Sequence, residues 1–401
     1  MQLLYTIIKL IEFIILAYFG FASGYILLFA FAGLFTLVKG EIKNKQQRKF
    51  AVLIPGYKED NVIVEVAQKA LQQDYPKSSF EVIVIADSFQ PATLQQLIEL
   101  PIKVVEVSFE KSTKSKALNK AMGVIGDAYD VALVLDADNI MAPDFITKIN
   151  DAFNRGFQVV QGHRAAKNLN TSFAILDAIS EEVNNQIFRK GHRVLGLSSA
   201  LIGSGMAFDY HFFKTTMAHV NAVGGFDKEL ELKLLKNKSK IEYVHDAIVL
   251  DEKVQKAAVF ENQRKRWLSA QFVYFRSYFF SGVKELLLRG NIDFFDKVYQ
   301  MIAPPRVLLL GLVTIITALY ATLQMFFRQQ WLSVSGMYWY VIFAATILAF
   351  ILAIPKKFYT QKTVMAALTL PKAFFMMFIS LFKLKGANKK FIHTQHGTIE
   401  N

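Results

Sequence analysis

Apolar residues gather in long runs toward both ends of the chain. The first run covers residues 13–38, and about 26 residues in a helix are enough to cross a bilayer with some tilt. Two similar runs cover residues 307–327 and 332–354. The pattern predicts one transmembrane helix before a central domain and two after it. The shorter apolar run before residue 13 is broken by Lys9 and Glu12, and we expect it to be an interfacial extension.

A fourth apolar run, residues 364–381, is short and contains Pro371 and Lys372 near its middle. Basic residues flank it, in the loop 356–362 and in the tail after Lys383. By the positive-inside rule both flanks lie in the cytoplasm, which requires that this run does not cross the membrane. We therefore expect an interfacial or re-entrant segment. Applied to the basic residues after the first span, the same rule places the central domain in the cytoplasm.

In the first part of the central domain, short apolar runs alternate with helix-like stretches. Buried strands are expected at residues 50–55, 80–85, 102–107 and 131–135. Such alternation predicts a sheet made of right-handed βαβ units. After residue 150 the pattern is less regular, with a strand at 159–164, a long helix at 171–189 and a strand at 240–244. The expected fold class is α/β, with a mixed, mostly parallel sheet.

The stretch from Val131 to Ile140, VALVLDADNI, ends a buried strand in Asp136 and Asp138. Ligands bind at the carboxyl edge of an open α/β sheet, and alternate residues of an extended segment can point the same way. Two carboxylates so placed suit Mg²⁺ or Mn²⁺, which can hold a diphosphate. Because one Asp-x-Asp is expected by chance in about every chain of this length, the buried strand and the motifs that follow must decide its meaning.

Composition assigns part of the chain to a membrane, since 53% of its residues are hydrophobic and 36 are phenylalanine. The formal net charge is +13, which suits nucleic acid, anionic lipid or phosphorylated substrates. Lys and Arg cluster beside the apolar runs, so we assign the excess to the membrane surface and expect no nucleic acid partner. The absence of cysteine excludes a disulfide framework and a thiolate metal site.

Basic and aromatic residues mix with apolar ones after residue 262, as in helices at a membrane surface. Gln263, Arg266 and Trp267 recur by chance at this spacing in only about one chain in a hundred. A guanidinium can hold diphosphate oxygens, and an indole can stack on a sugar face. The alternative is an Arg-Trp pair that anchors a helix at the headgroups. Upstream, a tight loop of small residues allows close approach of a ligand, or is simply a turn, at Gly203, Ser204 and Gly205.

Taken in order, these features resemble the membrane-embedded family 2 inverting glycosyltransferases, the group of cellulose, chitin, hyaluronan and poly-N-acetylglucosamine synthases. The resemblance runs from about residue 52 to residue 267. The run from Pro55 through Tyr57 to Glu59 is similar to the P-x-Y-N-E loop that accepts uracil and ribose, with Lys58 where Asn is usual. Asp87 corresponds to the aspartate that contacts the base.

Further along, Lys116 corresponds to the lysine of the G-K-x-x-A-L-N segment beside the donor, although Lys114 stands near the place of the usual glycine. Asp138, assisted by Asp136, corresponds to the metal-binding D-x-D. The resemblance implies a GT-A fold and metal-dependent transfer of a sugar, with inversion, from a nucleotide-diphosphate donor that we expect to be UDP-linked. The expected cofactor is Mg²⁺ or Mn²⁺.

The general base of the family is the aspartate of an E-D pair that precedes alternating leucines and an I-x-Y strand. Asp227 fits this frame, although Phe226 replaces the glutamate. Glu229 is the second candidate. Either carboxylate can take the proton of an acceptor hydroxyl if it lies within hydrogen-bond reach. Alternatively, both carboxylates merely stabilise the N-terminus of a helix.

The Q-x-x-R-W motif occurs both in synthases of linear polymers and in some ceramide glucosyltransferases, so it leaves the acceptor open. We expect polymer synthesis or oligomer extension, with transfer of a single sugar to a lipid as the alternative and a non-catalytic scaffold as a remote one. Partners beyond the bilayer, donor and acceptor would be further copies or other biosynthetic subunits. The expected divisions are a transmembrane helix (1–40), the catalytic domain (41–262), the motif with interfacial helices (263–303), membrane segments (304–382) and a basic cytoplasmic tail (383–401).

Overall fold

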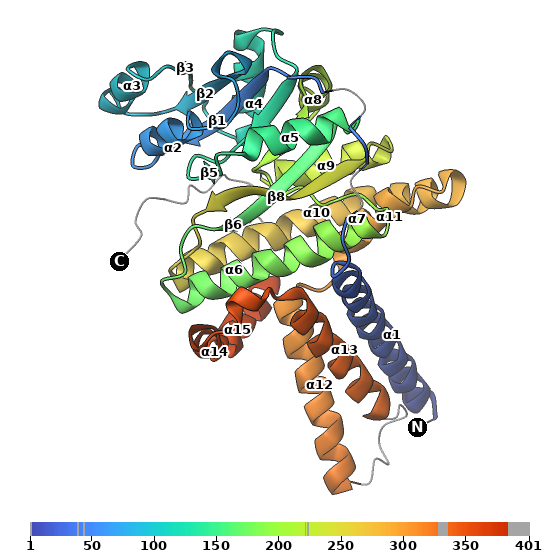
Figure 1. Cartoon of the computed structure of the whole chain (residues 1–401). Coiled ribbons are helices and arrows are strands. Elements are labelled where there is room, and N and C mark those ends of the chain that lie inside the picture. The colour runs from blue at the N-terminus through green and yellow to red at the C-terminus, as the bar shows by residue number, and fades with distance from the viewer. Residues whose placement is uncertain are drawn as a thin grey trace.

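The computed structural model describes residues 2–37, 40–42, 45–220, 222, 224–327 and 336–383. An α/β domain sits above a bundle of long helices, and further helices run between them (Figure 1). Nearly all of the expected basic tail, residues 384–401, lies outside the described residues, as does part of the basic stretch after the first span.

One eight-stranded sheet forms the centre of the upper domain, in the order β3-β2-β1-β4-β7-β6-β8-β5. The first half is parallel, as the alternation of strands and helices predicts. The strands of this half are β1 (Phe50–Tyr57), β2 (Phe80–Asp87), β3 (Lys103–Val107) and β4 (Val131–Val134). In β1, Phe50 and Val52 face one buried layer while Ala51 and Leu53 face the other, so the strand reads as a continuous apolar run.

The second half of the sheet is mixed. It contains β5 (Ile140–Met141), β6 (Val159–Ala166), β7 (Met206–Asp209) and β8 (Ile241–Asp251). β7 runs antiparallel to both β4 and β6, whereas β6 and β8 are parallel. The sequence pattern did not predict β5 or β7, because two and four residues are too few to show a period.

Helices cover both faces of the sheet. One face carries α2 (Ile63–Ala70) and α5 (Phe145–Asn154), and α3 (Pro91–Ile98) lies near the β3 edge. The other carries α4 (Lys114–Ile125), α8 (Tyr210–Met217) and α9 (Phe226–Lys236). Two buried layers of apolar side chains therefore fix the sheet, and the carboxyl ends of its central strands remain open for polar residues.

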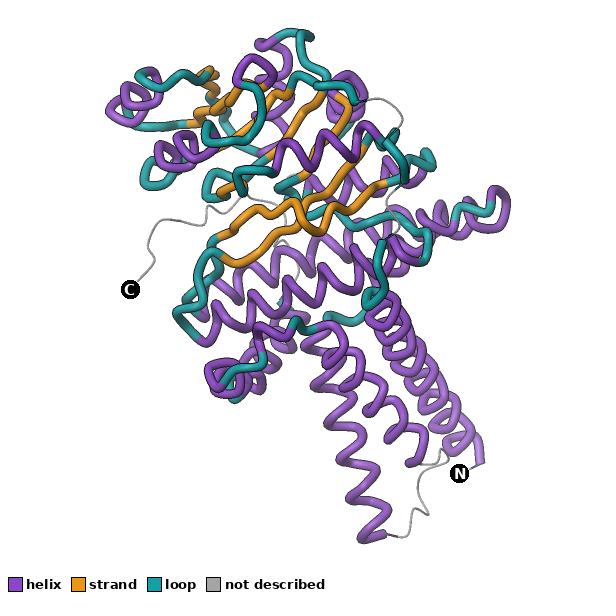
Figure 2. The backbone as a smooth tube through the Cα atoms, in the orientation of Figure 1, coloured by secondary structure: helices purple, strands orange, loops and turns teal. Residues whose placement is uncertain are grey.

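The layer beneath the sheet is helical (Figure 2). It consists of α6 (Ser172–Asn184), a π-helix (Asn185–Gly191), α7 (His192–Val194), α10 (Ala257–Arg289) and α11 (Ile292–Ile302). The sequence predicted one helix over 171–189, and the structure divides that stretch between α6 and the π-helix. α10 and α6 run side by side between the sheet and the bundle (Figures 1 and 2).

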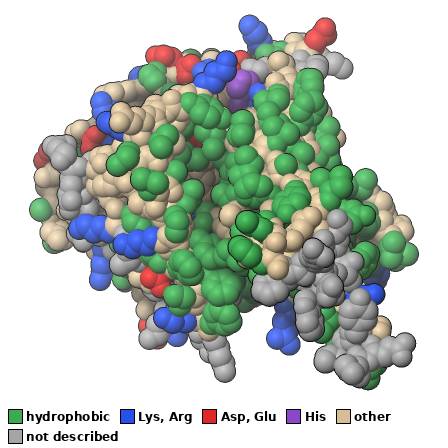
Figure 3. Space-filling view, turned by 90° about the horizontal axis from the view of Figure 1, so that it is seen from below, with side chains coloured by type: hydrophobic (Ala, Val, Ile, Leu, Met, Phe, Trp, Pro, Cys, Tyr) green, Lys and Arg blue, Asp and Glu red, His purple; other side chains and the backbone are tan. Residues whose placement is uncertain are grey.

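Three helices are long and apolar enough to cross a membrane: α1 (Gln2–Ala32), α12 (Arg306–Phe327) and α13 (Gly336–Ala353). α1 is continuous from residue 2, so the stretch around Lys9 and Glu12 extends the same helix and is not a separate span. The fourth apolar run forms α14 (Gln361–Ala367) and α15 (Leu370–Leu381), bent by 41° at a break near Pro371. Seen from below, hydrophobic side chains cover much of this end of the molecule (Figure 3).

Candidate active site

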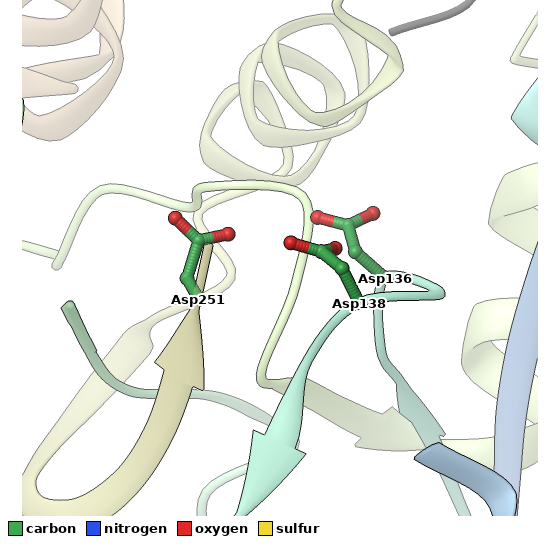
Figure 4. Close-up of side chains that lie close together, drawn as sticks. All are labelled: Asp136, Asp138 and Asp251. Carbon is green, nitrogen blue, oxygen red and sulfur yellow. The ribbon is translucent and has the colours of Figure 1, made fainter. Parts of the chain in front are cut away.

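Three aspartates meet at the carboxyl edge of the sheet. Asp136 and Asp138 lie in the turn after β4, and Asp251 is the last residue of β8. One carboxylate oxygen from each lies within 4.8 Å of the other two, and the close-up shows the carboxylates gathered at one edge (Figure 4). Three hard oxygen donors at this spacing fit Mg²⁺ or Mn²⁺.

The tight loop before β7 contacts the turn that carries Asp136 and Asp138 through hydrogen bonds. The Asp136 N–H donates to Ser204 Oγ at 2.9 Å, and the Ser204 hydroxyl donates to Asn139. Gly203 and Gly205 both have positive φ, and a Cβ at Gly205 would lie 2.7 Å from Val249. None of the three loop residues lines either of the two cavities described below. Their placement supports the aspartate turn, and the ligand contact expected from the sequence stays a prediction.

Asn139 connects the two sources of carboxylates. Its Nδ2 donates to Asp138 Oδ1 at 3.2 Å and to Asp251 Oδ1 at 3.1 Å. A neutral amide bridge keeps the turn after β4 in register with the end of β8 without neutralising either charge. The site geometry therefore depends on a residue that the sequence had not singled out.

Buried cations compensate these carboxylates. Arg164 NH1 lies 3.6 Å from Asp251 Oδ1, and Lys253 Nζ lies 2.6 Å from Asp251 Oδ2. Burial alone would raise the pKa of Asp251, but Arg164 and Lys253 hold it below its ordinary value. The same balance, with Arg189 added, lowers the pKa of Glu181. Asp251 is thus an ionised oxygen donor at neutral pH.

The first cavity, here the strand-end cavity, has a volume of about 310 Å³ and adjoins the three aspartates. The expected nucleotide contacts Pro55, Tyr57, Glu59 and Asp87 all line it. Asp87 ends β2 and is only 2% exposed, and its Oδ1 accepts a hydrogen bond from the Ser88 hydroxyl at 3.0 Å. The ends of β1, β2 and β4 therefore bring the candidate nucleotide and metal contacts together.

Lys116 lies outside both cavities, on the exposed side of α4, where its ammonium donates to the Lys111 carbonyl at 3.0 Å. Lys114 lines both cavities in its place. Its Nζ pairs with Asp136 and donates to the Gly203 carbonyl at 2.7 Å. Counted back from Ala117, the spacing of G-K-x-x-A-L-N places the lysine of the motif at Lys114, so the assignment of that lysine to Lys116 is two residues out.

The second cavity, here the helix-side cavity, has a volume of about 480 Å³ and lies between the sheet edge and the bundle. Asp136, Gln263, Arg266 and Trp267 line both cavities, so the two share a wall. From there the helix-side cavity reaches α1 at Ile26 and other bundle residues. A ligand in the strand-end cavity and a ligand that enters between the helices can therefore meet at this wall.

The Q-x-x-R-W residues lie on α10. Arg264, which lies between them, holds this part of the helix in its orientation. Arg264 donates to Asp177 Oδ1 at 2.5 Å, and its guanidinium lies 4.5 Å from the Trp267 ring centroid. Trp267 remains 41% exposed, which leaves indole surface for a ligand. Burial lowers the pKa of Arg266 from its ordinary value. At neutral pH the guanidinium remains a cation, because that ordinary value lies far above 7.

The two candidate bases differ in their surroundings. Asp227, near the start of α9, lines the helix-side cavity, and its Oδ2 lies 3.7 Å from Lys228 Nζ. Glu229 lines neither cavity and pairs with Lys233 at 2.7 Å. Only Asp227 of the two is placed where an acceptor could reach it.

Asp251 is the site residue that sequence reasoning missed. The expected strand ended at residue 244, whereas β8 continues to Asp251 across a register shift opposite Gly162 and His163. A signal was present, because Ala247 and Val249 are buried at alternate positions beyond that point. The strand-end rule that selected Asp136 would then have selected Asp251 as well.

Several known proteins are similar to this chain. Among curated proteins, a beta-monoglucosyldiacylglycerol synthase of Trichormus variabilis is 26% identical over 256 residues, covering 60% of this chain and 52% of that protein. The chain thus spans about half the length of these curated relatives. A shorter match, 33% over 79 residues, is to the poly(ribitol-phosphate) beta-N-acetylglucosaminyltransferase TarS of Staphylococcus aureus, covering 18% of this chain and 14% of that one.

Among solved structures, the mannosyltransferase PcManGT of Pyrobaculum calidifontis, in complex with GDP-Man and Mn²⁺, has a TM-score of 0.48 at 15% identity, covering 84% of this chain and 96% of that one. Residues 47–270 match the family described as "Glycosyltransferase like family 2". This match covers more than half of the chain, including the whole sheet and the Q-x-x-R-W motif. The chain therefore belongs to the family 2 glycosyltransferases, with a GT-A-like mixed sheet between N- and C-terminal apolar helices.

Proposed function

We propose that this protein transfers a single sugar from a nucleotide-diphosphate donor to a membrane lipid. The observation that carries the proposal is the shared wall between the two cavities, since one cavity adjoins the carboxylate cluster and the other reaches the apolar helices. The curated relatives with the longest matches are named as synthases of a glucosylated diacylglycerol. They favour the lipid alternative over the polymer synthesis expected from the sequence.

In this proposal the strand-end cavity holds the donor. Tyr57 and Asp87 contact the nucleoside, which we take to be uridine, and Arg266 holds diphosphate oxygens through its planar fork. Asp136, Asp138 and Asp251 hold Mg²⁺ or Mn²⁺. When bound, the metal supplies positive charge to the leaving diphosphate.

Asp227 is the proposed general base. It takes the proton of the acceptor hydroxyl as the oxygen forms a bond to the anomeric carbon. The bond between that carbon and the diphosphate oxygen breaks on the opposite face, so the configuration inverts and the nucleoside diphosphate leaves with the electron pair. Trp267 stacks against the sugar, and Gln263 lies beside it on the wall between the cavities.

Release of UDP from purified protein in nanodiscs tests this function. A panel of UDP-sugars is offered with Mn²⁺ or Mg²⁺, with and without lipid extract, and again after EDTA. We expect release with one donor, dependent on metal and strongly stimulated by lipid. UDP release that is unchanged by EDTA would contradict the metal role. If none of the UDP-sugars gave UDP release under any condition, the proposed activity would be contradicted.

A further inference from the structure

The helix-side cavity carries an excess of positive charge. Its lining includes eight Lys or Arg side chains but only four Asp or Glu side chains. A cavity of one dominant sign, walled by apolar helices, concentrates ligands of the opposite charge. The excess depends on which of these cations have a carboxylate partner within the protein.

Most of these cations are paired within the protein. A carboxylate oxygen lies within 4.0 Å of the charged nitrogens of Lys114, Arg164, Arg189, Lys228, Arg264 and Lys297. Arg266 belongs to the proposed diphosphate contact. These side chains therefore do not account for the excess.

Arg306 differs from them. It is the first residue of α12, where the chain enters a candidate membrane span. Its guanidinium lies 5.3 Å from the Phe188 ring centroid, and no carboxylate oxygen among the described residues lies within 4.0 Å of it. Glu181 attracts this guanidinium from a longer distance, while Arg264 and Arg189 repel it. A half-buried guanidinium without a direct anionic contact is costly, and a phosphate is the anion that its planar fork fits best.

The position of Arg306 separates this anion from the donor. Arg306 lines the helix-side cavity and not the strand-end cavity, where the diphosphate is proposed to lie. The lining of the same cavity also includes apolar residues of the bundle helices, among them Ile26, Leu309 and Met377. A molecule with acyl chains and one phosphate fits this combination, whereas a nucleotide does not.

We infer that the acceptor is an anionic phospholipid with a hydroxylated headgroup, and that Arg306 binds its phosphate. This inference rests on the proposed function and narrows its acceptor class. Arg306 holds the phosphate at the bundle end of the cavity, the acyl chains lie toward the apolar helices, and the headgroup hydroxyl extends toward Asp227 in the same cavity.

Transfer assays in nanodiscs test the inference. Phosphatidylcholine nanodiscs receive either phosphatidylglycerol, which is anionic and hydroxylated, or neutral diacylglycerol. We expect phosphatidylglycerol to be the better acceptor, and Arg306→Gln to raise its KM about tenfold or more while the KM of the UDP-sugar stays unchanged. Arg306→Lys should recover part of the loss. Arg276→Gln removes an exposed arginine of α10 that lines neither cavity, and it should match the wild type.

Phosphatidic acid provides a test that needs no variant. It carries the phosphate without the headgroup hydroxyl, so it should inhibit competitively against phosphatidylglycerol and not against the UDP-sugar. Glycerol 3-phosphate, which lacks acyl chains, should not inhibit. Equal use of diacylglycerol, no inhibition by phosphatidic acid, or equal inhibition by glycerol 3-phosphate would overturn the inference and leave lipid glycosylation standing. Transfer to neither lipid, with UDP still released, would overturn the proposed lipid acceptor itself.

Discussion

At the scale of single residues, the candidate metal site joins carboxylates from two strands that lie far apart in the chain. Asp136 and Asp138 lie directly after the apolar strand β4, where the local sequence pattern places them. Asp251 reaches the same site from a strand more than a hundred positions later, and only the packing of β8 brings it there. Lys114 needs no such packing to be found, because the G-K-x-x-A-L-N spacing counted back from Ala117 already places the lysine there, and the structure puts Lys114 on the lining of both cavities.

Asp251→Asn should weaken metal activation. The change keeps the size of the side chain but removes one of three negative charges around the proposed metal. We expect the Mn²⁺ concentration for half-maximal activity to rise about tenfold or more, in line with the loss of a charged ligand. Titration of UDP release with Mn²⁺ measures this. Asp127→Asn, which removes an exposed aspartate paired with Lys214 outside both cavities, should leave the titration unchanged.

Asp227→Asn distinguishes the two candidate bases. Loss of a general base is expected to lower kcat by about 10²- to 10⁴-fold. Glu229→Gln should remain close to wild type, since Glu229 lines neither cavity. Calorimetric binding of UDP controls for folding. Near-normal turnover by Asp227→Asn, or a comparable loss of kcat caused by Glu229→Gln, would reverse the assignment.

At the scale of elements, long periodic segments were predictable and short or irregular ones were not. The spans α12 and α13 appear where apolar length predicted them. β5 and β7 exist only because β4, β6 and β8 offer them hydrogen-bonding edges. The π-helix follows α6 and packs against α1, so it depends on a contact between segments that are distant in the sequence.

Gly191, at the end of the π-helix, permits that approach. A Cβ at this position would lie 2.1 Å from the Phe29 carbonyl oxygen of α1. Gly191→Ala must therefore displace α1, and overpacking of this kind costs about 1–3 kcal/mol. We expect a lower midpoint of thermal unfolding in detergent. Gly123→Ala is the control, because its new methyl group would meet nothing within 4 Å in α4 and should leave stability equal or slightly higher.

Lys297 of α11, which packs against α9, makes the stability of the fold depend on pH. Its Nζ lies 2.7 Å from buried Glu231, and burial lowers the pKa of Lys297 to about 8. Between that value and the unfolded pKa of about 10.4, the unfolded chain binds more protons, so the free energy of unfolding rises with pH. Relative to the double variant Glu231→Gln/Lys297→Met, the wild type should gain thermal stability from pH 7.5 to 9.5. A constant or shrinking difference would contradict this sign.

At the scale of the whole molecule, the order of segments was predictable and their contacts were not. Alternating strands and the Q-x-x-R-W motif indicated a glycosyltransferase α/β domain, which the family match confirms, and the apolar runs indicated the long apolar helices on either side of it. The helix-side cavity could not be foreseen, because α1, α10, α11 and α12 contribute its walls from opposite ends of the chain. This cavity, more than any motif, directs the account toward a lipid acceptor.

The mass of the lipid product distinguishes transfer of one sugar to a lipid from polymer synthesis. The protein in nanodiscs is supplied with Mn²⁺, native lipid extract and the UDP-sugar that supports UDP release, and the lipids are then analysed by mass spectrometry. We expect a lipid whose mass has increased by one sugar residue, without longer products at high donor concentration. A ladder of products with many sugars, or sugar found only in water-soluble material, would contradict this expectation.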